Sequence, residues 1–179
     1  MSFEKRLEEM YKDHEVKPYI SPERDLASWF LEAKPVPKRN MVRLEEGLLA
    51  GDIILLWRVH FGTFTTTTPY SKYFEYTYGI DGPAHMKNLL AEGYVYLESA
   101  FDSLNHITSM VKKNILKAEG VTGLSKMKAA DLDTALKFHL TEEKLAVYFS
   151  VRGYALTEKG IAALENHPEV IDKHPKKKM

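Results

Sequence analysis

The most informative stretch of this chain is residues 120–132, which read Gly-Val-Thr-Gly-Leu-Ser-Lys-Met-Lys-Ala-Ala-Asp-Leu. Before this stretch, apolar side chains recur at three- and four-residue spacing, which predicts a helix with one buried face: Ile107, Met110, Val111, Ile115 and Leu116. Gly120 is predicted to end that helix in the left-handed conformation, which glycine adopts without a steric penalty. Ser125 is predicted to cap a second helix that buries Met127 and Leu132. The sequence therefore predicts two short helices joined by an extended loop.

This helix, extended loop and helix, over residues 107–140, resembles the N-terminal domain of transcription termination factor Rho and the SAP domain. The Rho-like version fits better, because a SAP pattern would need two more residues between Gly120 and Leu132. Ala129 departs from the resemblance, since a basic residue is usual there. Modules of this kind mostly assist nucleic-acid binding within larger proteins, and a minority of related folds bind proteins. The resemblance therefore implies a class of partner and not a task. We expect nucleic-acid binding, with DNA in preference to RNA.

Five lysines flank the extended loop and are the predicted nucleic-acid contacts: Lys112, Lys113, Lys117, Lys126 and Lys128. Lysines on phosphates would make binding depend steeply on salt. The set contains no arginine or asparagine fork of the kind that discriminates base edges, so we expect sequence-tolerant binding. The alternative interpretation is an ordinary solvated helix face.

Residues 57–78 are rich in aromatic side chains, and four of them are a possible partner surface: Trp57, Tyr70, Tyr73 and Tyr76. Such rings can form a stacking platform or a groove for a partner peptide. The favoured interpretation is that they fill the interior of a small helical domain, with tyrosine hydroxyls reaching water. A protein-interaction module, such as an adaptor or a component of a bacterial or phage complex, is the alternative function.

The composition is that of a globular chain: 179 residues, of which 44% are apolar and 28% charged. The chain has no cysteine, which excludes disulfides and thiolate metal sites and is compatible with a cytoplasmic protein. Residues 1–12 alternate in charge, so we expect neither a signal peptide nor a membrane anchor. The apolar run at residues 53–57 is far shorter than the roughly 20 residues that span a bilayer. We therefore expect a soluble protein without a membrane partner.

The charges sum to zero but differ between the two parts of the chain. Residues 1–106 hold 12 basic and 16 acidic residues, whereas residues 107–179 hold 13 and 9. The second part ends in a basic tail at residues 173–178. A difference of this size also arises by chance in a neutral protein. The charge distribution is therefore compatible with a basic binding face but does not require one.

No catalytic signature is present in the sequence. The seven histidines form no His-Glu-x-x-His pattern, and no glycine-rich loop ends in Lys-Ser or Lys-Thr. Asp131 and Asp133 are interpreted as carboxylates that suit the positive end of a helix dipole. We expect a non-catalytic protein with no catalytic residue, no metal and no cofactor.

The chain is expected to be an α+β protein, mostly α, in three parts. These are an N-terminal helical arm and linker at 1–40, an aromatic-rich helical region at 41–106, and the Rho-like module with a C-terminal helix and basic tail at 107–179. Helices are predicted at 3–12, from Ser21, at 41–49, from Asp52, at 73–78 and from Gly82 to Gly93, with a short strand at 94–97.

Residues 93–98 and 153–158 share glycine, tyrosine and glutamate at matching positions, sixty residues apart. This similarity is either a weak internal repeat or ordinary turn chemistry. Residues 154–160, Tyr-Ala-Leu-Thr-Glu-Lys-Gly, resemble a phrase found in bacterial winged-helix regulators, and the remainder of the chain resembles bacterial or phage proteins. The resemblance implies a winged-helix-like corner of strand and helix, in which Thr157 caps the helix.

Overall fold

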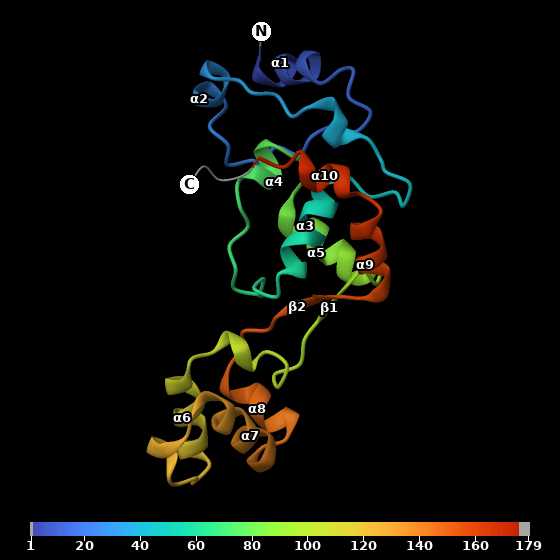
Figure 1. Ribbon diagram of the computed structural model, residues 1–179. Coiled ribbons are helices and arrows are strands. Elements are labelled where there is room, and N and C mark those ends of the chain that lie inside the picture. Colours follow the sequence, from blue (N-terminus) through green and yellow to red (C-terminus); the bar gives the residue numbers. More distant parts are fainter. Residues whose placement is uncertain (1, 176–179) are drawn as a thin grey trace. The chain divides into compact units, whose positions relative to one another are not determined.

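The computed structural model describes residues 2–175 and divides them into two compact units (Figure 1). Unit 1 comprises residues 2–60, 69–95 and 156–175, and unit 2 comprises residues 61–68 and 96–155. This division differs from the expected ranges 1–40, 41–106 and 107–179, because each unit is assembled from segments far apart in the sequence. The described residues form ten α-helices and two short strands, which confirms the α+β, mostly α class. None of these helices has the length and apolar character needed to cross a membrane.

The centre of unit 1 is helix α3, Ala50–His60, which is buried along almost its whole length. The 3-10 helix η1, Lys38–Met41, packs against it, as do α5, Gly82–Ala91, α9, Glu158–Glu165, and α10, Pro168–Asp172. The helix begins at Ala50, two residues before the predicted cap Asp52, which lies in the first turn and accepts the amide of Leu49 through its carboxylate at 2.8 Å. The continuous apolar run at residues 53–57 accounts for this burial, because a helix that is apolar on several sides is covered by neighbouring elements.

The predicted helix at 41–49 is wrong. Residues 42–49 form an irregular segment with a turn, in which the Gly47 amide donates to the Leu44 carbonyl at 2.8 Å. Gly47 has a positive φ of 87°, and a helix cannot continue through that conformation.

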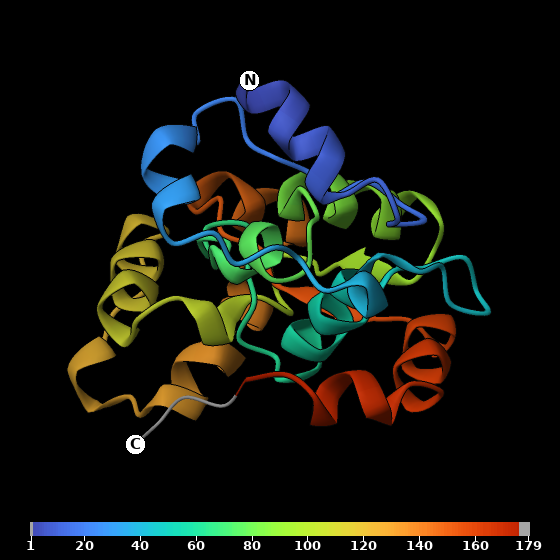
Figure 2. The same cartoon turned by 90° about the horizontal axis from the view of Figure 1, so that it is seen from above.

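The N-terminal part of unit 1 carries two short helices, α1, Phe3–Met10, and α2, Leu26–Leu31. Figures 1 and 2 show them next to each other, and Phe3 stacks on Phe30 with ring centroids 5.4 Å apart. Helix α2 begins later than the predicted start at Ser21, because Asp25 supplies the cap by accepting the Ser28 amide at 3.2 Å.

Helix α4, Tyr73–Tyr76, and the strand β1, Val95–Leu97, lie where the sequence predicted them. Strand β2, Tyr154–Leu156, pairs antiparallel with β1, as the Glu98 amide donates to the Gly153 carbonyl at 2.8 Å. The two similar segments of the sequence therefore pair with each other. After β2, the Thr157 hydroxyl accepts the Gly160 amide at 3.1 Å and caps α9, which confirms the predicted strand-to-helix corner.

Unit 2 contains η2, Leu104–His106, α6, Ser109–Ala118, η3, Leu124–Lys126, α7, Ala129–His139, and α8, Glu142–Tyr148. The helices surround one apolar core: Ala100, Leu104, Ile115, Leu116, Leu132, Leu136, Leu140 and Leu145. Glu142 fixes the turn before η2, because its carboxylate accepts the amides of Ala100 at 2.9 Å and Phe101 at 3.0 Å. This core holds the predicted helix-loop-helix in place.

Candidate nucleic-acid interface

The loop between α6 and α7 is shaped by two glycines in the left-handed conformation. Gly120 has φ 81° and Gly123 has φ 76°, a region that residues with a side chain rarely adopt. The Val121 amide donates to the Leu116 carbonyl at 3.0 Å and closes the end of α6. The predicted helix end at Gly120 is confirmed.

The start of the second helix differs from the prediction. Ser125 lies inside η3 and does not cap α7, which begins only at Ala129. The carboxylate of Asp131 accepts the Lys128 amide at 2.9 Å and so satisfies the backbone from within the first turn. Ser125 was predicted to be the cap because it precedes an apolar stripe. In the structure Ser125 lies within a 3-10 turn, and the helix begins only after that turn.

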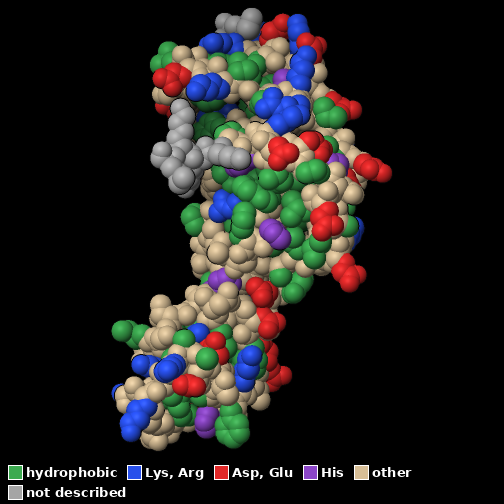
Figure 3. All heavy atoms as spheres, viewed as in Figure 1, with side chains coloured by type: hydrophobic (Ala, Val, Ile, Leu, Met, Phe, Trp, Pro, Cys, Tyr) green, Lys and Arg blue, Asp and Glu red, His purple; other side chains and the backbone are tan. Residues whose placement is uncertain are grey.

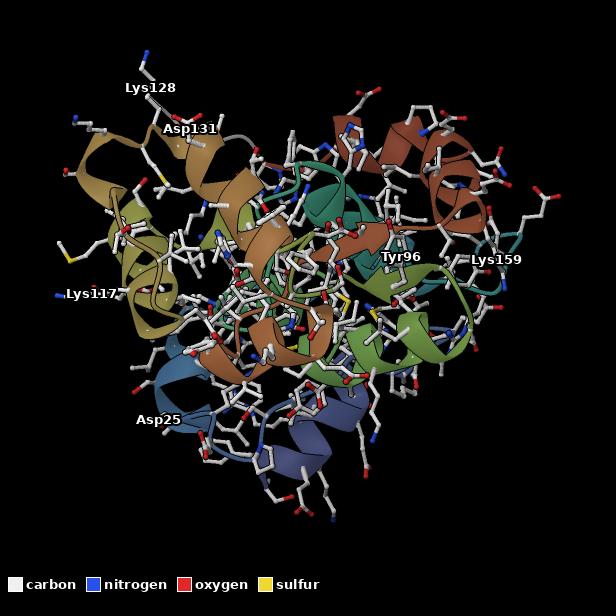
Figure 4. All side chains as sticks on the ribbon, turned by 90° about the horizontal axis from the view of Figure 1, so that it is seen from below. Asp25, Tyr96, Lys117, Lys128, Asp131 and Lys159 are labelled. Atoms are coloured by element: carbon white, nitrogen blue, oxygen red, sulfur yellow. The ribbon has the colours of Figure 1, made fainter. Side chains whose placement is uncertain are left out.

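Three of the five predicted lysines, Lys117, Lys126 and Lys128, are exposed, and Lys113 is half-buried. Within residues 2–175, no carboxylate forms an ion pair with any of these four side chains. Figure 4 shows Lys117 and Lys128 pointing away from the body of unit 2, with Asp131 beside the base of Lys128. The four ammonium groups are therefore available to an anionic ligand.

Lys112 is the exception among the predicted contacts. Its side chain is only 7% exposed, and its Nζ lies 2.7 Å from Oδ1 of Asp133 on α7. Lys112 precedes the buried Ile115 and Leu116 by three and four residues, which places it on the inner stripe of α6. This spacing was visible in the sequence, whereas the partner on another helix was not. Lys112 is a structural residue of unit 2, and the remaining candidate contacts are three exposed lysines and the half-buried Lys113.

Glu119, at the end of α6, links this helix to α8. Its carboxylate accepts the Tyr148 hydroxyl at 3.0 Å and lies 3.7 Å from Nζ of Lys144. The hydrogen bond to Glu119 raises the pKa of Tyr148, because ionising the phenol would lose its donor. The Glu119 carboxylate is thus engaged with α8 and forms no ion pair with Lys113, Lys117, Lys126 or Lys128.

The net charge of unit 2 is close to zero. Residues 61–68 and 96–155 together hold 8 basic and 7 acidic side chains. On the face seen in Figure 3, Lys and Arg side chains of this unit are interspersed with Asp and Glu. The basic excess of residues 107–179 therefore does not belong to the module as a whole. Attraction of an anion to unit 2 therefore depends on the positions of its lysines and not on its net charge.

An exposed aromatic side chain on α7 was not singled out from the sequence. Phe138 is 82% exposed, and its ring lies edge-on to that of His139 with centroids 4.9 Å apart. Lys137 beside it in the sequence is also exposed. Phe138 does not share the three- and four-residue spacing of the buried Leu132 and Leu136. This spacing could have predicted from the sequence that Phe138 is exposed.

Three of the four predicted partner-surface aromatics are built into unit 1. Trp57 is half-buried with its ring centroid 5.4 Å from that of His174, and the Tyr73 hydroxyl accepts Nη1 of Arg58 at 2.8 Å. Tyr70 is half-buried and packs edge-on near Phe74 in the same unit. These half-buried side chains pack against other residues of unit 1, which favours a structural role over a wholly exposed partner surface.

Tyr76 is the member of that set that reaches the surface, with 38% of it exposed. The Arg24 guanidinium lies 4.4 Å from the centre of its ring and forms an ion pair with Glu75. The tail that begins at Lys173 is described only as far as Pro175, so Lys176, Lys177 and Lys178 lie outside the described residues.

Among residues 2–175, no group of three His, Asp or Glu side chains is placed to hold a metal ion. Comparison with protein-family models, with curated proteins and with solved structures gives no match for this chain.

Proposed function

We propose that unit 2 binds nucleic acid, DNA in preference to RNA and largely without regard to sequence. The contacts are Lys113, Lys117, Lys126 and Lys128. The observation that carries the proposal is the placement of these four lysines, which no described carboxylate neutralises, on either side of a loop held by an apolar core.

The chemistry of the contact is that of ammonium groups and phosphates. Lysine acts as a mobile point charge and carries no base-reading geometry, which supports sequence tolerance. The start of α7 supplies little to an anion, because the Asp131 carboxylate already occupies it. Affinity therefore comes from lysine side chains and from the release of counterions around the phosphates. The role is non-catalytic, and the absence of cysteine suits a cytoplasmic protein.

Fluorescence anisotropy with labelled duplex and single-stranded oligonucleotides, over a salt series, tests the proposal. The informative variant is Lys126→Glu/Lys128→Glu. Each lost phosphate contact should lower the slope of log affinity against log salt by about 0.7 to 0.9, so the double variant should lose about 1.4 to 1.8 in slope. Lys5→Glu/Lys38→Glu, at exposed positions of unit 1, makes the same change in net charge and is the matched control.

The proposal requires that the unit 2 variant weakens binding while the unit 1 control does not. If both variants weaken binding equally, the affinity depends on net charge alone, and the proposed contacts of unit 2 are wrong. If neither strand type binds at low salt, the function is not nucleic-acid binding.

The exposed ring of Phe138 adds a distinction between strand types. Unpaired bases stack on exposed aromatic rings, whereas the bases of a duplex do not present their faces. Phe138→Ala should therefore weaken single-strand binding by about five-fold or more and leave duplex binding unchanged. An equal effect on both strands would exclude stacking.

The alternative function is a protein-interaction module. Of the four aromatic residues first considered for it, Tyr76 alone keeps an exposed fraction large enough to contact a partner.

A further inference from the structure

A pocket of about 490 Å³ lies in unit 1 between α2 and the end of α4. Its wall includes Trp29 and Glu32 of the α2 segment, the helix cap Asp25, Lys34, and Tyr76 of α4. The surface is hollowed between these two helices in Figure 3. The pocket belongs to unit 1, separate from the lysines of unit 2.

Aromatic rings in this wall already hold one cation. The Arg24 guanidinium lies 4.4 Å from the ring centre of Tyr76 and 5.1 Å from that of Trp29. The same group donates through Nε to the Glu75 carboxylate at 2.7 Å, and its side chain is only 3% exposed. Tyrosine and tryptophan rings attract cations through their electron-rich faces. These two rings are thus fixed in place by a buried ion pair.

Two carboxylates, those of Asp25 and Glu32, line the pocket. Asp25 accepts the Ser28 hydroxyl at 2.8 Å and the Ser28 amide at 3.2 Å, and these hydrogen bonds lower its pKa, so it is ionised at neutral pH. Glu32, which follows the last residue of α2, is exposed. Lys34 is the one cation among the described lining residues, so the lining carries a net charge of −1.

We propose that this pocket binds a basic side chain, lysine or arginine, presented by a peptide segment of a protein partner. The aliphatic stem of such a side chain packs on the rings of Trp29 and Tyr76, and its cationic head lies near the Asp25 and Glu32 carboxylates. Acidic peptides are excluded by the same charges. The site is independent of the nucleic-acid proposal, because it uses other residues of another unit.

The two tryptophans of the chain provide the measurement, since Trp29 lines the pocket and Trp57 does not. Their indole N–H signals are followed by nitrogen-15 NMR of the full chain during titration with capped hexalysine, with capped hexaglutamate as the control peptide. Trp57→Phe assigns the two signals. Hexalysine should shift the Trp29 signal saturably and the Trp57 signal little, and hexaglutamate should shift neither.

The pocket variant is Asp25→Ser/Glu32→Gln, in which serine keeps a capping hydroxyl for α2 while both charges are removed. It should weaken hexalysine binding by at least about three-fold. The control Glu15→Gln/Glu23→Gln removes two exposed charges of unit 1 outside the pocket and should bind as the parent does. Tyr76→Leu keeps the charges, removes one ring, and should also weaken binding about three-fold.

The inference is overturned if hexalysine leaves the Trp29 signal unmoved, or if pocket and control variants bind it equally. Oligonucleotide binding by the pocket variant separates the two proposals. It should be unchanged, because the four lysines of unit 2 are intact.

Discussion

The ion pair between Lys112 and Asp133 separates the structural lysine of α6 from the lysines proposed to bind phosphate. Lys112 is 7% exposed and Asp133 is 40% exposed, so the two partners are not equivalent. Removing Asp133 leaves a buried ammonium without a counter-charge, whereas removing Lys112 leaves a carboxylate whose side chain is 40% exposed, although the Oδ1 atom that faces Lys112 is itself buried. The cost of breaking the pair therefore depends on which side is changed.

The magnitudes follow from this asymmetry. Breaking a fully buried pair costs about 3 to 5 kcal/mol, and the partial exposure of Asp133 reduces this to about 2 to 3 kcal/mol for Asp133→Asn. Lys112→Met keeps the packing of the side-chain stem and removes the buried charge, so the free energy of unfolding should change by less than about 1 kcal/mol. Urea unfolding followed by circular dichroism, with hydrogen exchange at the amides of 109–139, measures both variants.

The binding measurement completes the test. Lys112→Met should bind oligonucleotides as the parent does, because the Lys112 ammonium is not exposed. The reasoning is refuted if Lys112→Met weakens binding as much as Lys126→Glu/Lys128→Glu, or if Asp133→Asn is no less stable than Lys112→Met.

Three further predictions concern unit 1. His167 lies between two carboxylates, with Nε2 2.6 Å from Glu46; burial alone would lower its pKa, but these carboxylates outweigh burial and raise it. The contribution of protonated His167 to the free energy of unfolding is therefore complete below its pKa in the unfolded chain and is lost as pH rises through its pKa in the folded protein. His167→Gln should remove this pH dependence of the melting temperature in a series of thermal melts. A variant with the same pH profile as the parent would contradict the prediction. Gly160→Ala should destabilise unit 1 by about 2 kcal/mol, because the added methyl would overlap the Tyr94 carbonyl oxygen; urea unfolding measures this, and a neutral effect would show that the backbone yields. Thr157→Ala should cost about 1 kcal/mol through loss of the α9 cap, with Thr157→Ser restoring it, and equal stability of both variants would exclude the cap.

Local signals predicted elements whose causes lie within a few residues. Gly120 ends α6 and Thr157 caps α9, because a left-handed glycine and a capping hydroxyl act on the adjacent turn. The apolar run at 53–57 lies in the buried helix α3, because a helix that is apolar on several sides is favoured at the centre of a fold. These interactions depend on sequence neighbours and were readable without the fold.

Predictions failed where a different local interaction competed. Ser21 and Ser125 both precede apolar stripes, yet Asp25 and Asp131 supply the backbone contacts and move the helix starts. Both aspartates were visible in the sequence, but propensity alone did not rank them against the serines.

The candidate site divides in the same way. The sequence identified the lysines around the loop but wrongly placed Lys112 among the contacts, although its three- and four-residue spacing from Ile115 and Leu116 was a signal that it is buried. The neutralisation of Lys112 by Asp133, and the engagement of Glu119 with Tyr148, required α6 to be packed against other helices. The same holds for the pocket at Trp29 and Tyr76, whose walls come from separate segments.

The sequence by itself determined the mostly helical class, the loop that joins α6 to α7, and the lysines around that loop. These follow from periodicity, glycine conformation and residue charge, which are properties of neighbouring residues. The packing of distant segments was needed to show which side chains stay exposed to a partner. It was also needed to show that unit 2 is formed from residues 61–68 and 96–155. The physical reason is that burial and ion pairing join residues distant in the sequence, and a local pattern carries no record of the distant partner.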